Sequence, residues 1–283
     1  MVNHYLTPRF ILHQFATGEE SGRFEAAAVF VDVSGFTAAT EVLMQHGQHG
    51  AEIMAQVMRT LFAPLVEVVY AYNGFVTGFA GDAFTAVFPI SKTDSLSAAV
   101  RALAAGAHVQ QHMTNHSDHE TPYGKFSFGI KVGIAKGETK WGILAGETHQ
   151  QHTYYFSGHA IDECAHAEHY AERGDLIISQ AILAEAAQRV TADPIAETSE
   201  FVRVTAVNTL PAAQTTPSDE IEFKQANGFM SEDLLTQTLT GEFRQIISMF
   251  ISMDGVESHA QLAKFMKAVF ALQTSYGGFF NRI

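Results

Sequence analysis

The sequence predicts an α/β protein, in which strands and helices alternate along the chain, and two observations support this class. Short apolar runs that end at polar turn residues are typical of strands, and each is followed by a longer segment with apolar residues at helical spacing. The chain contains 22 glycines and only 7 prolines, a balance that suits tight turns between strands and helices. With 283 residues, 47% of them hydrophobic, it can form one large domain with part of another, or two small ones.

The first part of the chain predicts a strand and a hairpin separated by a long helix. The expected elements are an amphipathic lead-in over 5–15, a strand over 24–33, a helix that begins at 34–37, a helix over 51–72, and hairpin strands over 75–79 and 83–88. The break at Asn73 and Gly74 separates the long helix from the hairpin, and Asp82 lies at the hairpin bend.

The middle of the chain continues the alternation. We expect a helix over 95–113, strands over 126–134 and 141–144 separated by a polar turn, a helix over 158–171, a strand over 175–179, a short helix over 180–187, and a strand over 201–207. Residues 211–219 are small, polar and marked by prolines, which is the composition of a linker.

After this linker the sequence predicts a short helix over 229–239 and then the start of an internal repeat. Residues 242–254 resemble 23–34, a helical stretch follows, and 276–282 align with 72–78. We therefore expect a lead-in helix over 1–23, a first domain over 24–210, a linker and helix over 211–241, and the N-terminal part of a second, degenerate copy over 242–283. A strand without its hairpin partner would leave an open sheet edge, so we expect the natural protein to continue.

Charge and cysteine content exclude several classes of function. The net charge of −13 argues against a nucleic-acid-binding protein, which needs a basic surface, but not against binding of a single nucleotide. Cys164 is the single cysteine, so an internal disulfide framework or a cysteine zinc site is excluded. Neither a signal peptide nor a long apolar run is recognisable, so we expect a cytoplasmic protein without a membrane span.

Two acidic residues next to strand ends predict a metal site. Asp32 ends the first strand and Asp82 lies at the hairpin bend, so one sheet edge can bring both carboxylates together to hold one or two divalent ions. The helix that begins at 34–37 offers backbone N–H groups to phosphates, and Gly35 permits close backbone approach. The alternative is that Asp32 caps the helix and Asp82 is an ordinary turn residue.

The 14 histidines are not expected to form a metal site. The pairs His149 with His152 and His166 with His169 have ligand-like spacing, but neither an HExxH motif nor a cysteine accompanies them. We interpret them as surface or interface histidines.

Several motifs occur in order at domain-scale spacing. They are FVDVSGFT at 30–37, GFAGDAF at 78–84, VGIAKG at 132–137, and GETH at 146–149 followed by FSGHAIDE at 156–163. Together they resemble the catalytic domain of class III adenylate/guanylate cyclases, most of all the first catalytic half of soluble adenylyl cyclases. The resemblance covers residues 5–210 and, more faintly, 242–283. It implies an α+β, ferredoxin-like domain with a mixed or antiparallel sheet flanked by helices, whose active site forms at the interface with a second cyclase half.

The resemblance also implies roles for individual residues. Asp32 and Asp82 would bind two Mg²⁺ or Mn²⁺ ions, assisted by the carbonyl of Val33. Gly35, Phe36 and Thr37 would lie over the phosphates of ATP, whose ribose 3′-hydroxyl attacks the α-phosphate to give 3′,5′-cyclic AMP and pyrophosphate. The residues that select the purine and stabilise the transition state would belong to the partner half.

Departures from the family pattern favour two complementary halves. Where the family has asparagine and arginine on the late helix, this chain has Asp162 and His166, so its first half lacks these transition-state groups. In the second copy Ser252 replaces the metal-binding aspartate, and Arg282 stands where the purine-reading lysine is expected. We therefore expect an adenylate cyclase that is inactive, or nearly so, as this fragment alone. Arg282 keeps GTP open as the substrate, and a non-catalytic, nucleotide-binding regulatory module is a further alternative.

Overall fold

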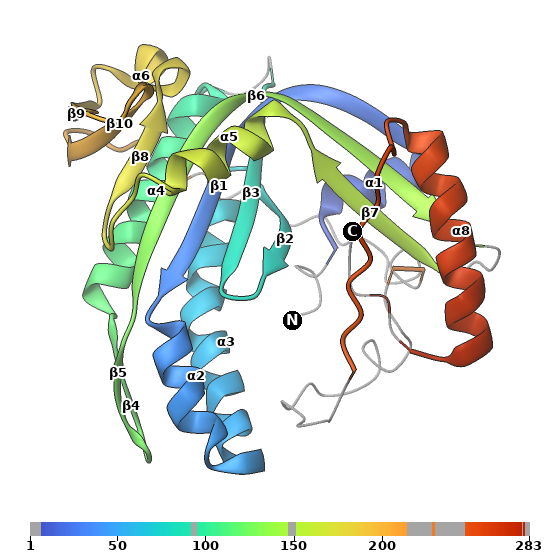
Figure 1. The fold of residues 1–283 in the computed structure, drawn as a ribbon. Helices are drawn as coiled ribbons and strands as arrows, with labels where there is room; N and C mark the ends of the chain where they lie inside the picture. The colour runs from blue at the N-terminus through green and yellow to red at the C-terminus, as the bar shows by residue number, and fades with distance from the viewer. Residues whose placement is uncertain are drawn as a thin grey trace. The chain divides into compact units, whose positions relative to one another are not determined.

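The computed structural model describes residues 7–91, 95–146, 151–213, 228–229, 247–278 and 280 (Figure 1). The helices are α1 (Arg9–Thr17), α2 (Phe36–Met44), α3 (Gly47–Ala71), α4 (Ala98–Asn115), α5 (His159–Glu168), α6 (Gln180–Ala186) and α8 (His259–Tyr276). The strands are β1 (Ser21–Ser34), β2 (Phe75–Ala80), β3 (Ala83–Pro89), β4 (Asp118–Thr121), β5 (Gly124–Ser127), β6 (Gly129–Ala145), β7 (His152–Ser157), β8 (Leu176–Ser179), β9 (Val190–Ile195) and β10 (Thr198–Val207).

A mixed sheet organises the fold and confirms the predicted class. Its strand order is β2-β3-β1-β6-β8-β10-β9, with β7 paired to β6. The β1–β3, β2–β3, β8–β10 and β9–β10 pairs are antiparallel, whereas β6 and β8 are parallel. The central strand β1 is exposed at its start and buried at 26–29, Val31 and Val33, where apolar side chains face both sides of the sheet.

Helices cover both faces of the sheet, and the strand β6 shows how. A side chain at Gly106 of α4 would meet the side chains of Val132 and Ile134 on one face of β6. A side chain at Gly133, which points the opposite way, would meet the backbone of α5. Hence α4 and α5 lie on opposite faces, and the two glycines permit close packing.

Serine side chains start several helices, as their capping preference predicts. Ser97 accepts a hydrogen bond from the N–H of Val100 at the start of α4, and Ser179 caps α6 in the same way. Ser258 forms a capping box with Gln261 at the start of α8.

The largest correction to the expected elements concerns β6. The polar turn expected between two strands is absent, and one strand runs from Gly129 to Ala145. Two polar side chains of this segment are taken up by the fold: Lys136 forms an ion pair with Glu185, and Thr139 is fully buried. The strands β4, β5, β7 and β9 were also not expected.

The chain divides into two compact units that do not follow its linear order. One unit comprises Phe24–Thr139 and Ser157–Ser218, and the other comprises Met1–Arg23, Lys140–Phe156 and Asp219–Ile283. The first unit differs from the expected domain over 24–210 because residues 140–156 group with the chain ends. The second unit has its own core, in which Leu144 packs with Leu262, Met266 and Phe270 of α8.

The first strand expected for a second copy is not present in the part of 242–254 that the structure describes. Residues 247–258 form neither helix nor strand, and Ile247 and Phe250 are almost fully exposed. The helix after them is confirmed as α8, and its last residue, Tyr276, is the one that aligns with Tyr72 at the end of the expected helix over 51–72. The strand expected after it lies outside the described residues except for Phe280. A strand needs a neighbour for its backbone hydrogen bonds, and none pairs with 247–258 among the described residues. The predicted helix over 229–239 lies outside the described residues except for Phe229.

Among the described residues, one helix, α3, is long and apolar enough to cross a membrane by length and composition alone. Its apolar stripe, which includes Met54, Leu61, Leu65 and Val69, is buried in the fold, as in a core helix. The absence of a membrane span stays a prediction.

Candidate functional site

The fold brings the two predicted acidic residues together. Asp32 near the end of β1 pairs with Ala83 at the start of β3, so Asp82 lies directly beside β1. The N–H of Val33 donates a hydrogen bond of 3.0 Å to the carbonyl oxygen of Asp82. Asp32 and Asp82 are therefore neighbours where β1 meets the β2–β3 bend; their role in metal binding stays a prediction.

A buried arginine holds the base of this hairpin. The guanidinium of Arg101 on α4 donates to the carbonyl oxygens of Tyr72 and Asn73 before β2, and to that of Pro89 at the end of β3. These hydrogen bonds satisfy backbone acceptors at both ends of the hairpin, which fixes its position on the sheet.

The start of α2 lies next to Asp32 and lacks a side-chain cap. Gly35 is the N-cap residue with φ 95°, a left-handed conformation that favours glycine. A side chain there would also come within 2.6 Å of the carbonyl oxygen of Ser127, so both backbone and space require glycine. Phe36 and Thr37 are the first residues of the helix, and Gly35 and Thr37 are exposed. Their N–H groups belong to the first turn, the part of a helix that can bind an anion.

Asp32 carries an electrostatic cost in its ionised form. Burial raises the pKa of its carboxyl above the ordinary value, and the carboxylates of Glu168 and Asp82 raise it further, while Lys131 acts in the opposite direction. The effect of Asp82 reflects the closeness of the two acids. A divalent cation between them would relieve this repulsion.

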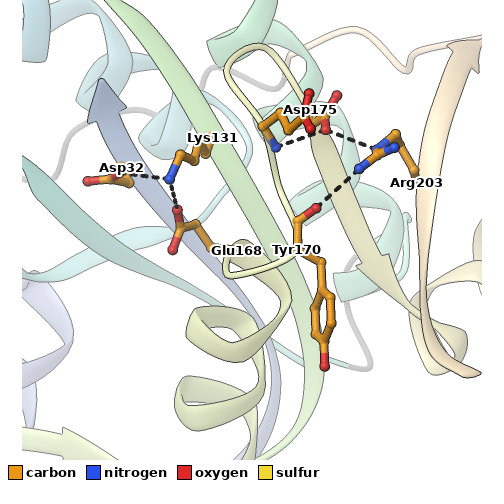
Figure 2. Close-up of polar contacts among 7 residues, drawn as sticks. Asp32, Lys131, Glu168, Tyr170, Asp175 and Arg203 are labelled. Carbon is orange, nitrogen blue, oxygen red and sulfur yellow. Dashed lines mark hydrogen bonds and ion pairs between the residues drawn. The ribbon is translucent and has the colours of Figure 1, made fainter. Parts of the chain in front are cut away.

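Lys131 and Glu168 extend the site beyond the predicted residues (Figure 2). The ammonium of Lys131 on β6 lies 3.9 Å from Asp32 Oδ2 and 3.1 Å from Glu168 Oε1 at the end of α5. Glu168 is almost fully buried, and its hydrogen bond raises the pKa of Lys131. Lys131 is therefore held, charged, between the two acids.

The sequence offered little signal for these two residues. Lys131 belongs to a strand next to a glycine motif, and Glu168 is one of several acids in a helix, with no motif that sets it apart. Only the pairing of β6 with β1 and the packing of α5 on β6 bring them to Asp32.

The remaining predicted site residues have different outcomes. Val33 is buried, with its N–H bonded to Asp82. Arg282 lies outside the described residues. The hydroxyl of Ser34, between Asp32 and Gly35, is buried without a hydrogen-bond partner among the described residues, so a polar group remains to be satisfied at this site.

The site is an open sheet end, and two of the cavities in the fold lie elsewhere. A cavity of about 400 Å³ lies between α3 and the end of α4, where His112, His116 and His119 line it with Asp118. A second, of about 220 Å³, lies beside Arg173 and Gly174. Neither is lined by Asp32 or Asp82. The carboxylate pair is the better candidate for the functional site, because its charges and the helix start beside it suit the binding of metal ions and phosphates.

The donor set fits a divalent metal ion. Two neighbouring carboxylates supply the oxygen ligands that Mg²⁺ and Mn²⁺ prefer, and a helix start and a lysine beside them supply positive charge for phosphates. Such a surface can bind a metal–polyphosphate complex.

Comparison with known protein families gives a match over most of this region. The family model described as the adenylate and guanylate cyclase catalytic domain matches residues 20–199. Adenylate cyclase type 10 from Homo sapiens is 26% identical over 158 residues, which cover 55% of this chain and 9% of that protein. The protein of the same name from Rattus norvegicus is 25% identical over 158 residues, covering 55% of this chain and 10% of its own length. The chain thus spans about a tenth of these relatives.

Solved structures share the fold at low identity. The adenylyl cyclase CyaB from P. aeruginosa has a TM-score of 0.51 and 20% identity, covering 65% of this chain and 94% of its own. The guanylate cyclase domain of RhGC from Catenaria anguillulae, solved with GTP, has a TM-score of 0.51 and 16% identity, covering 66% and 99%. A bacterial light-regulated adenylyl cyclase has a TM-score of 0.54 and 18% identity, covering 73% and 60%.

Proposed function

This chain belongs to the adenylate and guanylate cyclase catalytic domain family, and on that premise we propose that it is the metal- and phosphate-binding half of an adenylate cyclase. The proposed reaction converts ATP to 3′,5′-cyclic AMP and pyrophosphate, and it would take place in the cytoplasm. The observation that carries the proposal is the meeting of Asp32 and Asp82 beside the uncapped start of α2.

The carboxylates of Asp32 and Asp82 would hold two Mg²⁺ or Mn²⁺ ions, with the Val33 carbonyl as a further ligand. Bound ions of this kind lower the pKa of a coordinated hydroxyl and neutralise the charge on phosphate oxygens. The first N–H groups of α2, at Phe36 and Thr37, would orient the triphosphate through its oxygens. Gly35 would lie over the phosphates through its backbone, because its φ of 95° sets the turn between Asp32 and α2.

Lys131 adds a fixed positive charge beside the same carboxylates. Its ammonium is held by Glu168 at 3.1 Å, so it needs little reorganisation to meet an incoming phosphate oxygen. We therefore assign Lys131 to the triphosphate and Glu168 to the positioning of Lys131.

Catalysis would require a second cyclase half. Asp32 and Asp82 lie on an open sheet end, and Asp162 and His166 replace the asparagine and arginine that the family pattern places on the helix here called α5. The partner half would supply the groups that read the purine and stabilise the transition state. This fragment is accordingly expected to be inactive, or nearly so.

Two alternatives compete with this function. Guanylate cyclase is supported by the fold shared with the GTP-bound RhGC domain. Turnover of ATP and GTP in competition, by the chain combined with a second cyclase half, would distinguish the two substrates. A non-catalytic regulatory module would still bind nucleotide, but cyclic nucleotide output would not depend on Asp32.

The deciding experiment combines metal binding with turnover. Mn²⁺ binding to the chain, followed by electron paramagnetic resonance of the free ion, should be lost in Asp32→Ala and Asp82→Asn and retained in Asp118→Asn, a matched exposed acid. When the chain is combined with a second cyclase half, Asp32→Ala should abolish cyclic AMP formation. Unchanged output in that variant would reject the catalytic proposal, and Mn²⁺-dependent turnover by the isolated chain would reject the need for a second half.

A further inference from the structure

A second group of ligand-type side chains lies on α5, apart from Asp32 and Asp82. Glu163 and His166 of α5 and Glu200 of β10 each offer one ligand atom, and these atoms all lie within 4.8 Å of one another. We propose that these three residues form a binding site for a divalent transition-metal ion of the Zn²⁺ class. The site would join α5 to β10 and is separate from the proposed catalytic ions.

Helix geometry accounts for the first two ligands. Residues three positions apart project from the same side of a helix, so Glu163 and His166 are neighbours on α5. The third ligand comes from the sheet, because β10 pairs with β8 and α5 packs against that region. The imidazole of His166 packs edge-on against Phe201, at 5.3 Å between ring centroids, which holds it next to Glu200.

The charges of the group favour a cation. Two carboxylates lie close together, and neither Glu163 nor Glu200 forms an ion pair with any lysine or arginine that the structure describes. Within the part of the chain that the structure describes, this pair of carboxylates therefore lacks the kind of lysine partner that Asp32 has in Lys131. Near His166, the Tyr170 hydroxyl lies 3.4 Å from Nε2, and such a contact from outside the ligand set orients a metal-binding imidazole.

The donor types select the class of ion. Imidazole nitrogen and carboxylate oxygen are both ligands of Zn²⁺, and three protein ligands leave a fourth position for water or another ligand. Donor atoms around a tetrahedral zinc ion are about 3.3 Å apart, given metal–ligand distances of about 2.0 Å. Glu200 is exposed and Glu163 and His166 are half-buried, so small side-chain rotations can close the remaining gap. Mg²⁺ fits less well because it prefers oxygen ligands only.

The sequence did not predict this site. It offered His166 only in a ligand-like spacing with His169, and both were interpreted as surface or interface histidines. The rings of those two histidines are 6.2 Å apart, and His169 is exposed. The partners that the structure gives to His166 are an acid one turn earlier and an acid 34 positions later.

The test uses Co²⁺ as a spectroscopic substitute for Zn²⁺ on the 283-residue chain. All variants carry Asp82→Asn, so the proposed catalytic ions do not contribute and the two proposals can fail independently. The parent should bind one Co²⁺ with visible absorption bands typical of nitrogen and oxygen ligands. His166→Gln and Glu200→Gln should each raise the apparent Kd at least about tenfold, and the metal-induced rise in melting temperature should disappear in both.

Two controls make the result decisive. His169→Gln removes a neighbouring histidine outside the ligand group and should leave the Kd unchanged. His116→Gln tests whether Co²⁺ binds instead at the stacked pair of His112 in α4 and His116 just after it. Circular dichroism without metal should show the parent fold in every variant. If His166→Gln does not fold, Glu200→Gln still tests the proposal, because Glu200 is exposed and its replacement should not disturb the core. The proposal is overturned if Glu200→Gln binds Co²⁺ like the parent, or if only His116→Gln removes the signal.

Discussion

At the scale of single residues, Asp32 combines functional value with a cost in stability. Burial and the carboxylates of Glu168 and Asp82 all raise its pKa, so its ionised form is less stable in the folded metal-free protein than in the unfolded chain. Residues placed for chemistry often oppose the stability of the fold around them.

Replacing Asp32 with asparagine should therefore stabilise the metal-free protein at neutral pH. A raised folded-state pKa means that stability from this carboxyl is fully present below its unfolded pKa and is lost as the pH rises through the folded pKa. In EDTA the melting temperature of Asp32→Asn should exceed that of the parent, and added Mn²⁺ should stabilise only the parent. Asp118→Asn should instead lower the melting temperature, because Lys125 lowers the pKa of Asp118 and so stabilises its ionised form in the fold. Equal metal stabilisation in parent and Asp32→Asn would contradict the metal assignment.

Glu168→Gln tests how the charged neighbours of Asp32 affect the pKa of its carboxyl. Loss of the Glu168 charge removes the largest electrostatic cause of the raised pKa and releases Lys131 toward Asp32, so the pKa of Asp32 should fall. Carbon-13 NMR titration of the Asp32 carboxyl in metal-free protein measures this directly. The acidic limit of Mn²⁺ binding should move to lower pH in the same variant. If the pKa of Asp32 stays at the parent value, Glu168 does not influence this carboxyl.

At the scale of secondary-structure elements, close contact between α5 and β6 positions both Lys131 and Glu168. Gly133 makes this contact possible: an added Cβ would overlap the carbonyl oxygen of Cys164 and come within 2.6 Å of the N–H nitrogen of Glu168. The atoms it would displace are helix backbone, which cannot rotate away.

Gly133→Ala should consequently destabilise the fold by about 1–3 kcal/mol, the usual cost of overpacking, measured by urea unfolding. The control is Gly78→Ala on β2, where a side chain would meet nothing within 4 Å and the backbone is not left-handed. That variant should be neutral or more stable by about 0.4–1 kcal/mol, since alanine restricts the unfolded chain. Similar losses in both variants would show that the α5 contact is not the cause.

At the scale of the whole molecule, the two compact units provide separate reporters. Cys164 belongs to the unit of Asp32; it is fully buried, and burial raises the pKa of its thiol, so it should not react with thiol reagents in the native protein. Helix α8 belongs to the other unit and contains Lys264 and Lys267, where trypsin can cut when the helix is released.

Met266→Asp should release α8 while Cys164 stays protected. Met266 is 1% exposed in the core with Leu144, and loss of such a side chain costs about 2–5 kcal/mol before the added charge is counted. Limited trypsin digestion should cut at α8, and thiol labelling should stay slow. Leu272→Asp, on the exposed side of the same helix, should change neither. Equally rapid thiol labelling and cleavage in Met266→Asp would show that both units unfold together.

The sequence by itself determined the features that depend on local patterns. Each of these features depends on a few neighbouring residues: the alternation of elements, the turn after Asp32, the hairpin around Asp82 and the glycine at position 35. The family model matches the region that contains them. The expected second copy shows the limit of that reasoning. The likeness of 242–254 to 23–34 predicted a strand, but a strand also needs a partner, and the described residues 247–254 form none.

Only the tertiary structure decided which distant side chains share a site. The continuity of β6, the position of Lys131 between Asp32 and Glu168, and the meeting of Glu163 and His166 with Glu200 all depend on how strands pair and on which helix covers them. Contacts between residues far apart in the chain leave no periodic pattern, because they are fixed by packing across the sheet and not by local geometry.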